Sequence, residues 1–368
     1  MDISRKNLNY DEQAIFALRD LYSRFGYQRY KMSRFEEYDL YVQNKDFLVS
    51  DEVITFTDRS GRLLAMKPDV TLSIIKNAPE GPGLVQKVYY NENVYRTDGN
   101  HTFREIMQSG LECIGDLTEY DVAEVVLLAA KSLALISERF VLDLSHMGLI
   151  AALLDASGLS PAGKAAALTC LRQKNSHELR ALCAQEQVDP RKLVLLAECS
   201  GNASDVLPRI RSLTDTPAVT DACRQLEDLC ALLDRFGFSD AVRLDFSVGN
   251  DLKYYSGVVF RGYIEGLPSG ILSGGQYDAL LRKMGRKRSA IGFALYTDLL
   301  ERLQKSETDY DIDTVVLHDN ADPAALMTAV ATLDTESTLV TTAIPRDKTW
   351  RRLVKFENGE VVTLENNG

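Results

Sequence analysis

The chain has 368 residues, of which 45% are hydrophobic and 26% charged, and its formal net charge at pH 7 is −11. This composition is typical of a globular protein with one large domain and an appendage, or with two domains. The acidic balance argues against a nucleic-acid partner, although a local basic patch could still bind one.

The six cysteines have no metal-ligand spacing, so we expect reduced, buried thiols and neither a metal site nor a bound cofactor. The first residues are polar and contain no apolar signal segment. No apolar run approaches the roughly 18 residues that span a bilayer. We therefore expect a cytoplasmic protein without membrane association.

The first predicted element is a helix from Tyr10 to Phe25, which has apolar residues at helical spacing and is followed by Gly26. A strand and a turn are predicted over residues 27–41. A hairpin follows, with strands at Val53 to Phe56 and Leu63 to Lys67. The next residues begin a helix, because Pro68 is tolerated near a helix start and Asp69 favours the first turn.

The most informative stretch is Lys87 to Gly115, which predicts two strands joined by a polar turn at residues 97–102. In the second strand, alternation places Gln108, Gly110 and Glu112 on one face, and the apolar residues on the other. The glycine would leave room, and the two polar side chains would supply acceptors to a cationic or amide-rich ligand. The alternative is an antiparallel sheet with one solvated face.

The second half of the chain predicts a helix from Tyr120 to Leu135 and a strand from Phe140 to Leu144. Short helices are predicted from Ser160 to about Phe236. Strands follow at residues 244–248 and 255–263, around a turn at residues 249–251. His146 lies between apolar segments, and we interpret it as a packed or capping residue.

The hairpin resembles motif 2 of class II aminoacyl-tRNA synthetases, and specifically of the histidyl enzymes. Their pattern runs from an aromatic-Arg pair, here Tyr95-Arg96, to Arg-x-x-x-Gln-x-Gly-x-Glu, here Arg104 to Glu112. The resemblance implies an α+β fold: a class II synthetase-like core with an antiparallel β-sheet flanked by helices, and a helical insert at about 155–235. It implies a synthetase-like domain over residues 1–305 and a small C-terminal α/β region over 306–368.

Three further segments resemble the histidyl enzymes. The segment from Lys67 to Thr71 is similar to their Arg-Pro-Glu-Gly-Thr, whose acid and threonine help to hold the ammonium group of the amino acid. Tyr254-Tyr255-Ser256-Gly257 resembles their Tyr-Tyr-Thr-Gly, and the segment around Tyr277 resembles their Gly-Gly-Arg-Tyr-Asp. The histidine-binding residues that the resemblance implies are Asp69, Thr71, Arg96, Gln108, Glu112, Tyr254, Tyr255 and Tyr277.

The chain departs from the histidyl pattern at the positions that serve ATP. Adenylate formation needs cations where negative charge develops on the α-phosphate. The family places arginines there, but this sequence has Asn250, Gln276 and Leu299. Lys253 is a point charge and only a partial substitute for a bidentate guanidinium. We therefore expect a pocket that recognises histidine without activating it, and no catalytic residue.

The tail over residues 306–368 predicts a strand at TVVLHD, a helix after Asp322-Pro323, and strands at Leu339 to Ile344 and near Val361 to Leu364. It contains 5 Lys or Arg and 12 Asp or Glu, so its formal charge is 5 − 12 = −7. Histidyl synthetases end in a longer domain that reads the anticodon. A short acidic tail is a poor platform for RNA, and we expect no tRNA partner.

These features together resemble the regulatory subunit family of ATP phosphoribosyltransferase, which serves the first step of histidine biosynthesis. That family is not catalytic: it is needed by a short catalytic subunit for activity and for feedback inhibition by histidine. The resemblance implies a hetero-octamer with the catalytic subunit and histidine as effector. A self-dimer is also implied, although Ser33 stands where motif 1 usually has proline. The alternatives are a divergent histidyl-tRNA synthetase and a synthetase-like module that serves another carrier or partner.

Overall fold

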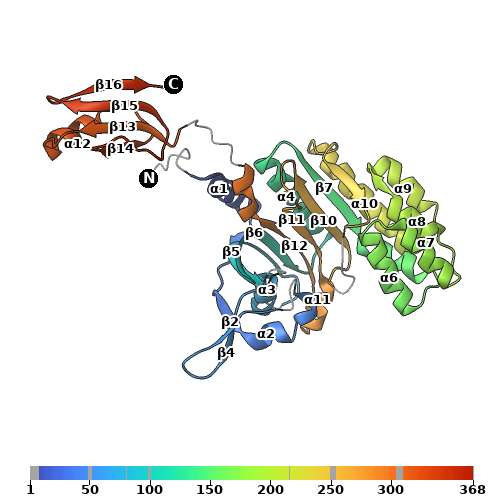
Figure 1. The fold of residues 1–368 in the computed structure, drawn as a ribbon. Coiled ribbons are helices and arrows are strands. Elements are labelled where there is room, and N and C mark those ends of the chain that lie inside the picture. Colours follow the sequence, from blue (N-terminus) through green and yellow to red (C-terminus); the bar gives the residue numbers. More distant parts are fainter. Residues whose placement is uncertain are drawn as a thin grey trace. The chain divides into compact units, whose positions relative to one another are not determined.

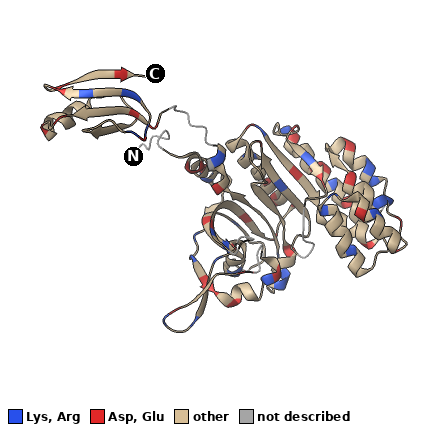
Figure 2. Cartoon of the chain, viewed as in Figure 1, with Lys and Arg blue, Asp and Glu red and all other residues tan. Residues whose placement is uncertain are grey.

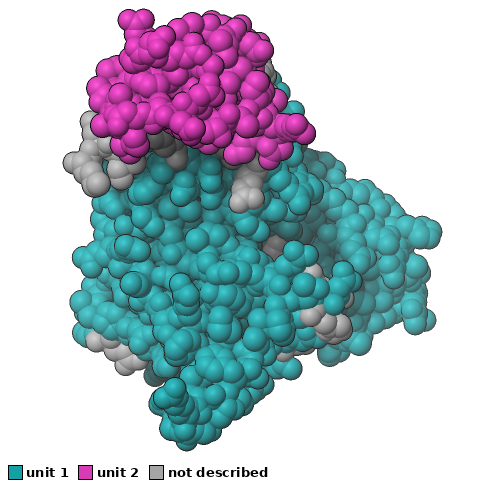
Figure 3. Space-filling model, turned by 60° about the vertical axis from the view of Figure 1, so that its left-hand side comes forward, with its two compact units in different colours: residues 1–303 teal, residues 304–368 magenta. Residues whose placement is uncertain are grey.

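The computed structural model describes residues 8–48, 52–79, 81–97, 100, 102–214, 216–248, 254–303 and 310–367. Figure 1 shows the secondary-structure elements. The chain divides into two compact units, Met1–Leu303 and Gln304–Gly368 (Figure 3). The units are described separately because each has a hydrophobic core of its own.

The first unit is built on a nine-stranded sheet in the order β1-β5-β6-β12-β11-β10-β7-β9-β8. The β1–β5 and β7–β9 pairs are parallel, and the other pairs are antiparallel. The strands are β1 (Gln28–Arg29), β5 (Val85–Thr97), β6 (Phe103–Gly115), β7 (Phe140–His146), β8 (Ser200–Gly201), β9 (Val242–Asp245), β10 (Val258–Ile264), β11 (Leu272–Gln276) and β12 (Ser289–Tyr296).

The long β5–β6 hairpin lies next to β12 in this sheet. Its register pairs Val85 with Gly115 and Thr97 with Phe103. Of the turn between the strands, residues 98, 99 and 101 lie outside the described residues. Strand alternation sorts the side chains as predicted, because Leu111 and Cys113 enter one core whereas Glu112 and Ile114 face the opposite side.

The first face of the sheet is covered by helices, which bury the larger core. These include α1 (Tyr10–Arg24), α4 (Glu119–Ile136) and α5 (Met147–Asp155). Helix α4 begins at a capping box in which Thr118 and Asp121 exchange backbone and side-chain hydrogen bonds, so its start is fixed locally.

The opposite face is covered by shorter elements, which bury a second core. Helices α3 (Thr71–Asn77) and α11 (Asp278–Lys283) pack there, beside a small antiparallel sheet in the order β2-β4-β3. The remaining elements of this part are β2 (Phe35–Glu37), α2 (Tyr38–Val42), η2 (Lys45–Phe47), β3 (Thr55–Thr57) and β4 (Leu63–Met66).

The predicted helical block is a cluster of five helices that follows α5 in the chain (Figure 1). Helix α10 connects the cluster to the sheet region, because it packs on both α5 and α4. The helices are α6 (Pro161–Arg172), α7 (Ser176–Gln185), α8 (Arg191–Glu198), α9 (Ala203–Arg211) and α10 (Pro217–Arg235). Acidic and basic side chains are interspersed over the cluster (Figure 2).

Three local predictions for the first unit are wrong in detail. Strands β9 and β10 do not pair, because β7 lies between them. The strand predicted from residue 255 begins at Val258, so Tyr255 precedes β10. Residues 38–41 begin a helix, α2. For the strands, long-range pairing decided the backbone, and local propensity could not reveal it.

The second unit is a four-stranded sheet in the order β14-β13-β15-β16, with one helix. Helix α12 begins after Asp322, whose side chain accepts a hydrogen bond from the Ala325 N–H. The sequence prediction missed β15, although it is the strand that joins β13 to β16. The elements are β13 (Ile312–His318), α12 (Pro323–Ala331), β14 (Thr338–Thr341), β15 (Trp350–Glu357) and β16 (Glu360–Asn366).

After β12 the chain forms a 3-10 helix, η3 (Thr297–Leu303). Among the described residues, no helix combines the length and the apolar character needed to cross a bilayer.

Candidate functional site

A cavity of about 390 Å³ lies on the face of the main sheet that carries α3 and α11. Its lining comes from the strands β5, β6, β10, β11 and β12, from η2 and the start of α3, and from the segments that precede α3, β10 and α11. All eight residues predicted to bind histidine line this one cavity: Asp69, Thr71, Arg96, Gln108, Glu112, Tyr254, Tyr255 and Tyr277. Residues up to 208 positions apart in sequence, 277 − 69, are thus brought together.

The carboxyl of Glu112 is the most deeply buried charged group in the cavity wall, with 2% of the residue exposed. Thr71 donates a 2.8 Å hydrogen bond from its hydroxyl to Oε1, and Tyr277 donates one to Oε2. Burial raises the pKa of Glu112 to about 8, and nearby Asp69 adds to the rise, while the two hydrogen bonds oppose it. The carboxyl is therefore held in a fixed position and is poised to ionise when a cation arrives.

Gly292 on β12 makes room for this carboxyl. A Cβ at position 292 would lie 1.8 Å from Oε2 of Glu112 and 2.5 Å from the Leu111 carbonyl oxygen. The glycine that the sequence analysis singled out, Gly110, has a different role from the one predicted. Its missing side chain is replaced by the hydroxyl of Tyr90, 2.6 Å from where a Cβ would be. Gly110 thus allows close packing and does not leave open space.

Asp69 and Arg96 form a second charged part of the wall. Asp69 accepts a 2.9 Å hydrogen bond from the Leu72 N–H and so caps the start of α3, as its position predicted. Burial raises the pKa of Asp69, and the Leu72 N–H and Arg96 counteract this. Arg96 donates from Nε to the Pro68 carbonyl oxygen at 2.9 Å, which ties it to the same segment.

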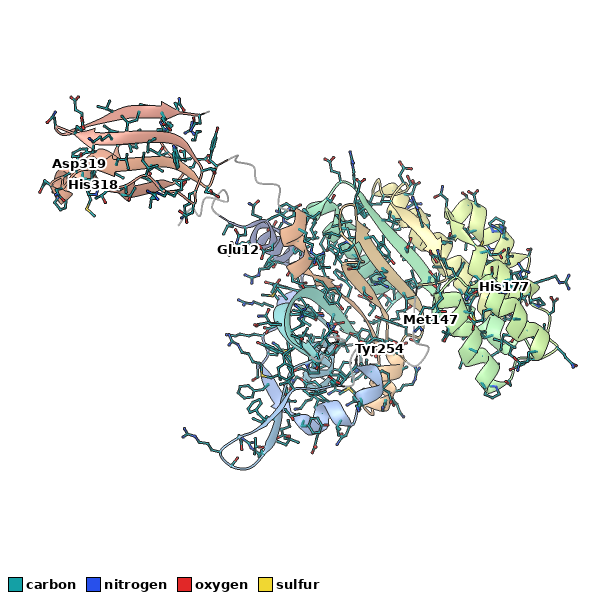
Figure 4. The ribbon with its side chains drawn as sticks, in the orientation of Figure 1. Glu12, Met147, His177, Tyr254, His318 and Asp319 are labelled. Carbon is teal, nitrogen blue, oxygen red and sulfur yellow. The ribbon has the colours of Figure 1, made fainter. Side chains whose placement is uncertain are left out.

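Three tyrosines and a phenylalanine make the aromatic side of the cavity. The ring of Tyr254, labelled in Figure 4, lies 4.6 Å from that of Tyr255 and 5.9 Å from that of Tyr277. Phe47 packs on Tyr254 at 5.8 Å. These rings can pack against the flat face of a heteroaromatic ligand, and their hydroxyls can hydrogen-bond its nitrogens.

The sequence analysis missed several residues that line the cavity. Two of them lie directly across the sheet from residues that the sequence singled out: Tyr90 from Gly110, and Tyr296 from Gln108. Only the pairing of the strands makes that signal readable. The missed polar or aromatic lining residues are Phe47, Tyr90, Arg261, Ser273 and Tyr296.

Two of the three positions where the resemblance places ATP-binding arginines make contacts within the fold. Leu299 packs against the larger core from η3. Gln276 accepts a 2.8 Å hydrogen bond from the Val258 N–H through its side-chain oxygen. Asn250, Asp251 and Lys253 lie outside the described residues. His146 is 7% exposed and accepts a hydrogen bond from the Leu149 N–H, so it caps α5.

The chemistry of the cavity suits a small ligand with two positive or donor ends. Two carboxyls with raised pKa values lie near each other on one side, and aromatic rings lie on another. A ligand that brings one positive charge would favour ionisation of these carboxyls and would be held by the resulting attraction. An amino acid with an imidazole side chain has the necessary groups.

Comparisons with known proteins identify the relatives of this chain. The family model described as histidyl-tRNA synthetase matches residues 1–300. ATP phosphoribosyltransferase regulatory subunits are similar to this chain in sequence. The one from Alkaliphilus metalliredigens is 27% identical, in an alignment that covers 75% of this chain and 72% of the relative. The one from a Thermoanaerobacter species is 29% identical, and the alignment covers 79% of this chain and 78% of the relative.

Solved structures share the fold. A protein from Bacillus halodurans described as an ATP phosphoribosyltransferase regulatory subunit/histidyl-tRNA synthetase has a TM-score of 0.75 at 22% identity, over 93% of this chain and 90% of its own. The histidyl-tRNA synthetase of Nostoc has a TM-score of 0.73 at 14% identity, and the match covers 99% of this chain and 97% of that one. A chain of the ATP phosphoribosyl transferase (HisG:HisZ) complex from Thermotoga maritima has a TM-score of 0.64 at 19% identity, and the match covers 78% of this chain and 97% of that one. The predicted fold class is therefore confirmed.

Proposed function

Since this chain belongs to the histidyl-tRNA synthetase family, and within it to the regulatory subunits of ATP phosphoribosyltransferase, we propose that it binds histidine in the cavity at Glu112 and thereby controls a catalytic partner. The observation that carries the proposal is the buried carboxyl of Glu112, held by Thr71 and Tyr277. An imidazole N–H is a suitable donor to such a fixed acceptor.

The ammonium group of histidine would lie near Asp69 and Thr71. Burial raises the pKa of Asp69, so a nearby positive charge would favour its ionised form. A ligand ammonium would supply that charge. The ring of histidine would pack against Tyr254 and Tyr255, which supports a preference for a flat side chain over an aliphatic one.

Adenylation is not part of the proposed function. Replacing a cation that stabilises developing charge typically lowers a rate by a hundredfold or more. Leu299 packs in the core and Gln276 is bound to the backbone, so neither is available to take the place of an ATP-binding arginine. We therefore expect histidine to be bound and released unchanged.

Control of the catalytic subunit follows from linkage. If histidine binds one arrangement of the complex more tightly than another, it shifts the equilibrium by that difference in affinity and no more. The proposed assembly is a hetero-octamer of four regulatory and four catalytic chains, in which the regulatory chains also form dimers. The complex from Thermotoga maritima is the precedent for a two-component enzyme of this kind.

Reconstitution with a short catalytic subunit tests the proposal. We expect formation of phosphoribosyl-ATP only when both chains are present, and inhibition by histidine. Glu112→Gln should keep the activation but weaken inhibition by about ten- to a hundredfold, because a charge-assisted hydrogen bond is lost. Calorimetry on the chain alone should give the same loss of histidine affinity.

Glu105→Gln is the matched control, because Glu105 is an exposed glutamate on the same strand outside the cavity. It should behave like the unchanged chain. Equal inhibition of the Glu112→Gln and unchanged complexes would place the effector site elsewhere. Histidine-dependent exchange of pyrophosphate into ATP by the chain alone would instead support a synthetase.

A further inference from the structure

Lys67 is a buried lysine that the proposed function does not use. It follows β4 directly and precedes Pro68 and Asp69, and 1% of the residue is exposed. Its ammonium group forms an ion pair with Glu92 on β5, in which Nζ lies 2.5 Å from Oε2. Only 14% of the Glu92 side chain is exposed. Lysine is almost never fully buried without a partner, and Glu92 is the partner here.

The backbone of Lys67 joins the small sheet to the main sheet. Its N–H donates to the Arg34 carbonyl oxygen at 3.1 Å, and its carbonyl oxygen accepts from the Tyr95 N–H at 2.9 Å. Arg34 directly precedes β2, and Tyr95 lies in β5. The guanidinium of Arg96 binds the next carbonyl oxygen, that of Pro68. Lys67 thus anchors the chain at the point where it enters the wall of the cavity.

Asp69 and Thr71 follow Lys67 on the same short segment. Asp69 accepts a hydrogen bond from the Leu72 N–H, and Thr71 donates one to the carboxyl of Glu112. Because one residue separates Lys67 from Asp69, a displacement of the lysine also moves the carboxyl that is proposed to meet the ammonium group of the ligand. The described lining of the cavity does not include Lys67, so the lysine acts through its neighbours.

Glu92 lies directly across the sheet from Gln108, which lines the cavity. The Cβ atoms of residues opposite each other in an antiparallel pair are about 5 Å apart. Glu92 is therefore a third carboxyl close to the two that line the cavity, those of Asp69 and Glu112. The ammonium group of Lys67 balances its charge. Glu92 is consequently not available to attract the ammonium group of a ligand away from Asp69.

We infer that the Lys67–Glu92 ion pair is the positioning element that sets the place of the ligand's ammonium group. The inference rests on the proposed function and deepens it, because it names what holds Asp69 and Thr71 in register with Glu112. A buried ion pair adds little net stability, since the desolvation of two charges offsets their attraction. The pair instead makes the segment dock on β5 in the one position where the charge of Lys67 meets Glu92.

Calorimetry on the full chain with two ligands tests the inference. L-Histidine has an α-ammonium group, and imidazolepropionate has the same ring and carboxylate without it. The unchanged chain should bind histidine about ten- to a hundredfold more tightly than imidazolepropionate. The double variant Lys67→Met/Glu92→Gln removes both charges together, so that neither is left buried without a partner. It should lose about tenfold in histidine affinity, through a displaced charge-assisted contact, and should bind imidazolepropionate as before.

Two further variants separate positioning from a structural role. Lys67→Arg should retain the preference for histidine, because its guanidinium can still pair with Glu92. Lys76→Met is the matched control: Lys76 is a lysine on α3 whose side chain is 43% exposed and forms an ion pair with Glu36. This variant should leave both affinities unchanged.

Unaltered binding of imidazolepropionate also reports that the double variant is folded. Equal weakening of both ligands, or a preference for histidine that survives in the double variant, would overturn this inference while the proposed function stands. An unchanged chain that binds neither ligand would overturn both.

Discussion

At the scale of single residues, Glu112 links the stability of the fold to ligand binding. Its ordinary pKa is 4.5, and burial raises the folded-state pKa to about 8. Between these values the folded chain holds a proton that the unfolded chain has released. The free energy of unfolding therefore decreases as the pH rises from about 4.5 to about 8, and this contribution is constant above that range.

Glu112→Gln should remove this pH dependence. An amide cannot ionise, so the ligand-free variant should be more stable than the unchanged chain at pH 8 by up to a few kcal/mol, and similar to it near pH 5. Urea unfolding at several pH values between 5 and 8 measures the difference. Glu105→Gln should follow the unchanged chain throughout. The same pH dependence of the free energy of unfolding in Glu112→Gln and in the unchanged chain would contradict this account.

At the scale of the elements, β12 fits against β6 because glycine occupies position 292. Its partner in the register is Glu112, and the carboxyl folds back over the glycine. A side chain at position 292 would force the carboxyl or the Leu111 carbonyl to move. The strand thus determines the shape of the cavity floor as well as the order of the sheet.

Gly292→Ala should therefore lower the free energy of unfolding by about 1–3 kcal/mol, as overpacking in cores does, and should abolish histidine binding. Gly61→Ala is a useful comparison, because Gly61 has a φ of +83° in the β3–β4 turn and nothing within 4 Å of an added Cβ. Gly61→Ala should lower the free energy of unfolding by about 1 kcal/mol through backbone strain and leave histidine binding intact. Thermal unfolding and calorimetry on both variants check this; normal affinity in Gly292→Ala would contradict it.

At the scale of the whole molecule, the cavity belongs to one of the two units. Every residue of its lining lies between positions 46 and 296, within the unit Met1–Leu303. The second unit has its own small cores on β13, β15 and α12. The lining that the structure describes thus includes no residue of the acidic tail.

Removal of residues 304–368 should consequently leave histidine affinity unchanged within about twofold, because the described lining of the cavity belongs to the first unit. Calorimetry on the shortened chain measures this, and its far-UV circular dichroism reports whether the first unit is folded. The activity of a reconstituted complex would then tell whether the tail serves the partner. A large loss of affinity in a folded shortened chain would show that the tail contributes to the pocket.

The sequence by itself determined the family, the β5–β6 hairpin and the eight residues that meet in the cavity. These followed from short-range information: strand alternation sorts Glu112 from Leu111, Asp69 precedes a helix, and the motif spacings are local. Asp69, Thr71, Tyr254, Tyr255 and Tyr277 were chosen as ligand-binding residues from the resemblance to the family, since Asp69 alone suits a helix start and a tyrosine pair alone suits a strand.

Tertiary structure alone decided the rest. The pairing of β10 with β7, the close approach of Tyr90 to Gly110 and the position of Arg261 beside Asp143 all depend on which strands become neighbours. The sequence prediction also missed β15, which pairs with both β13 and β16. Strand pairing joins residues far apart in the chain, and neither local propensity nor spacing specifies that choice. The charges that face a ligand are therefore fixed only when the sheet is assembled.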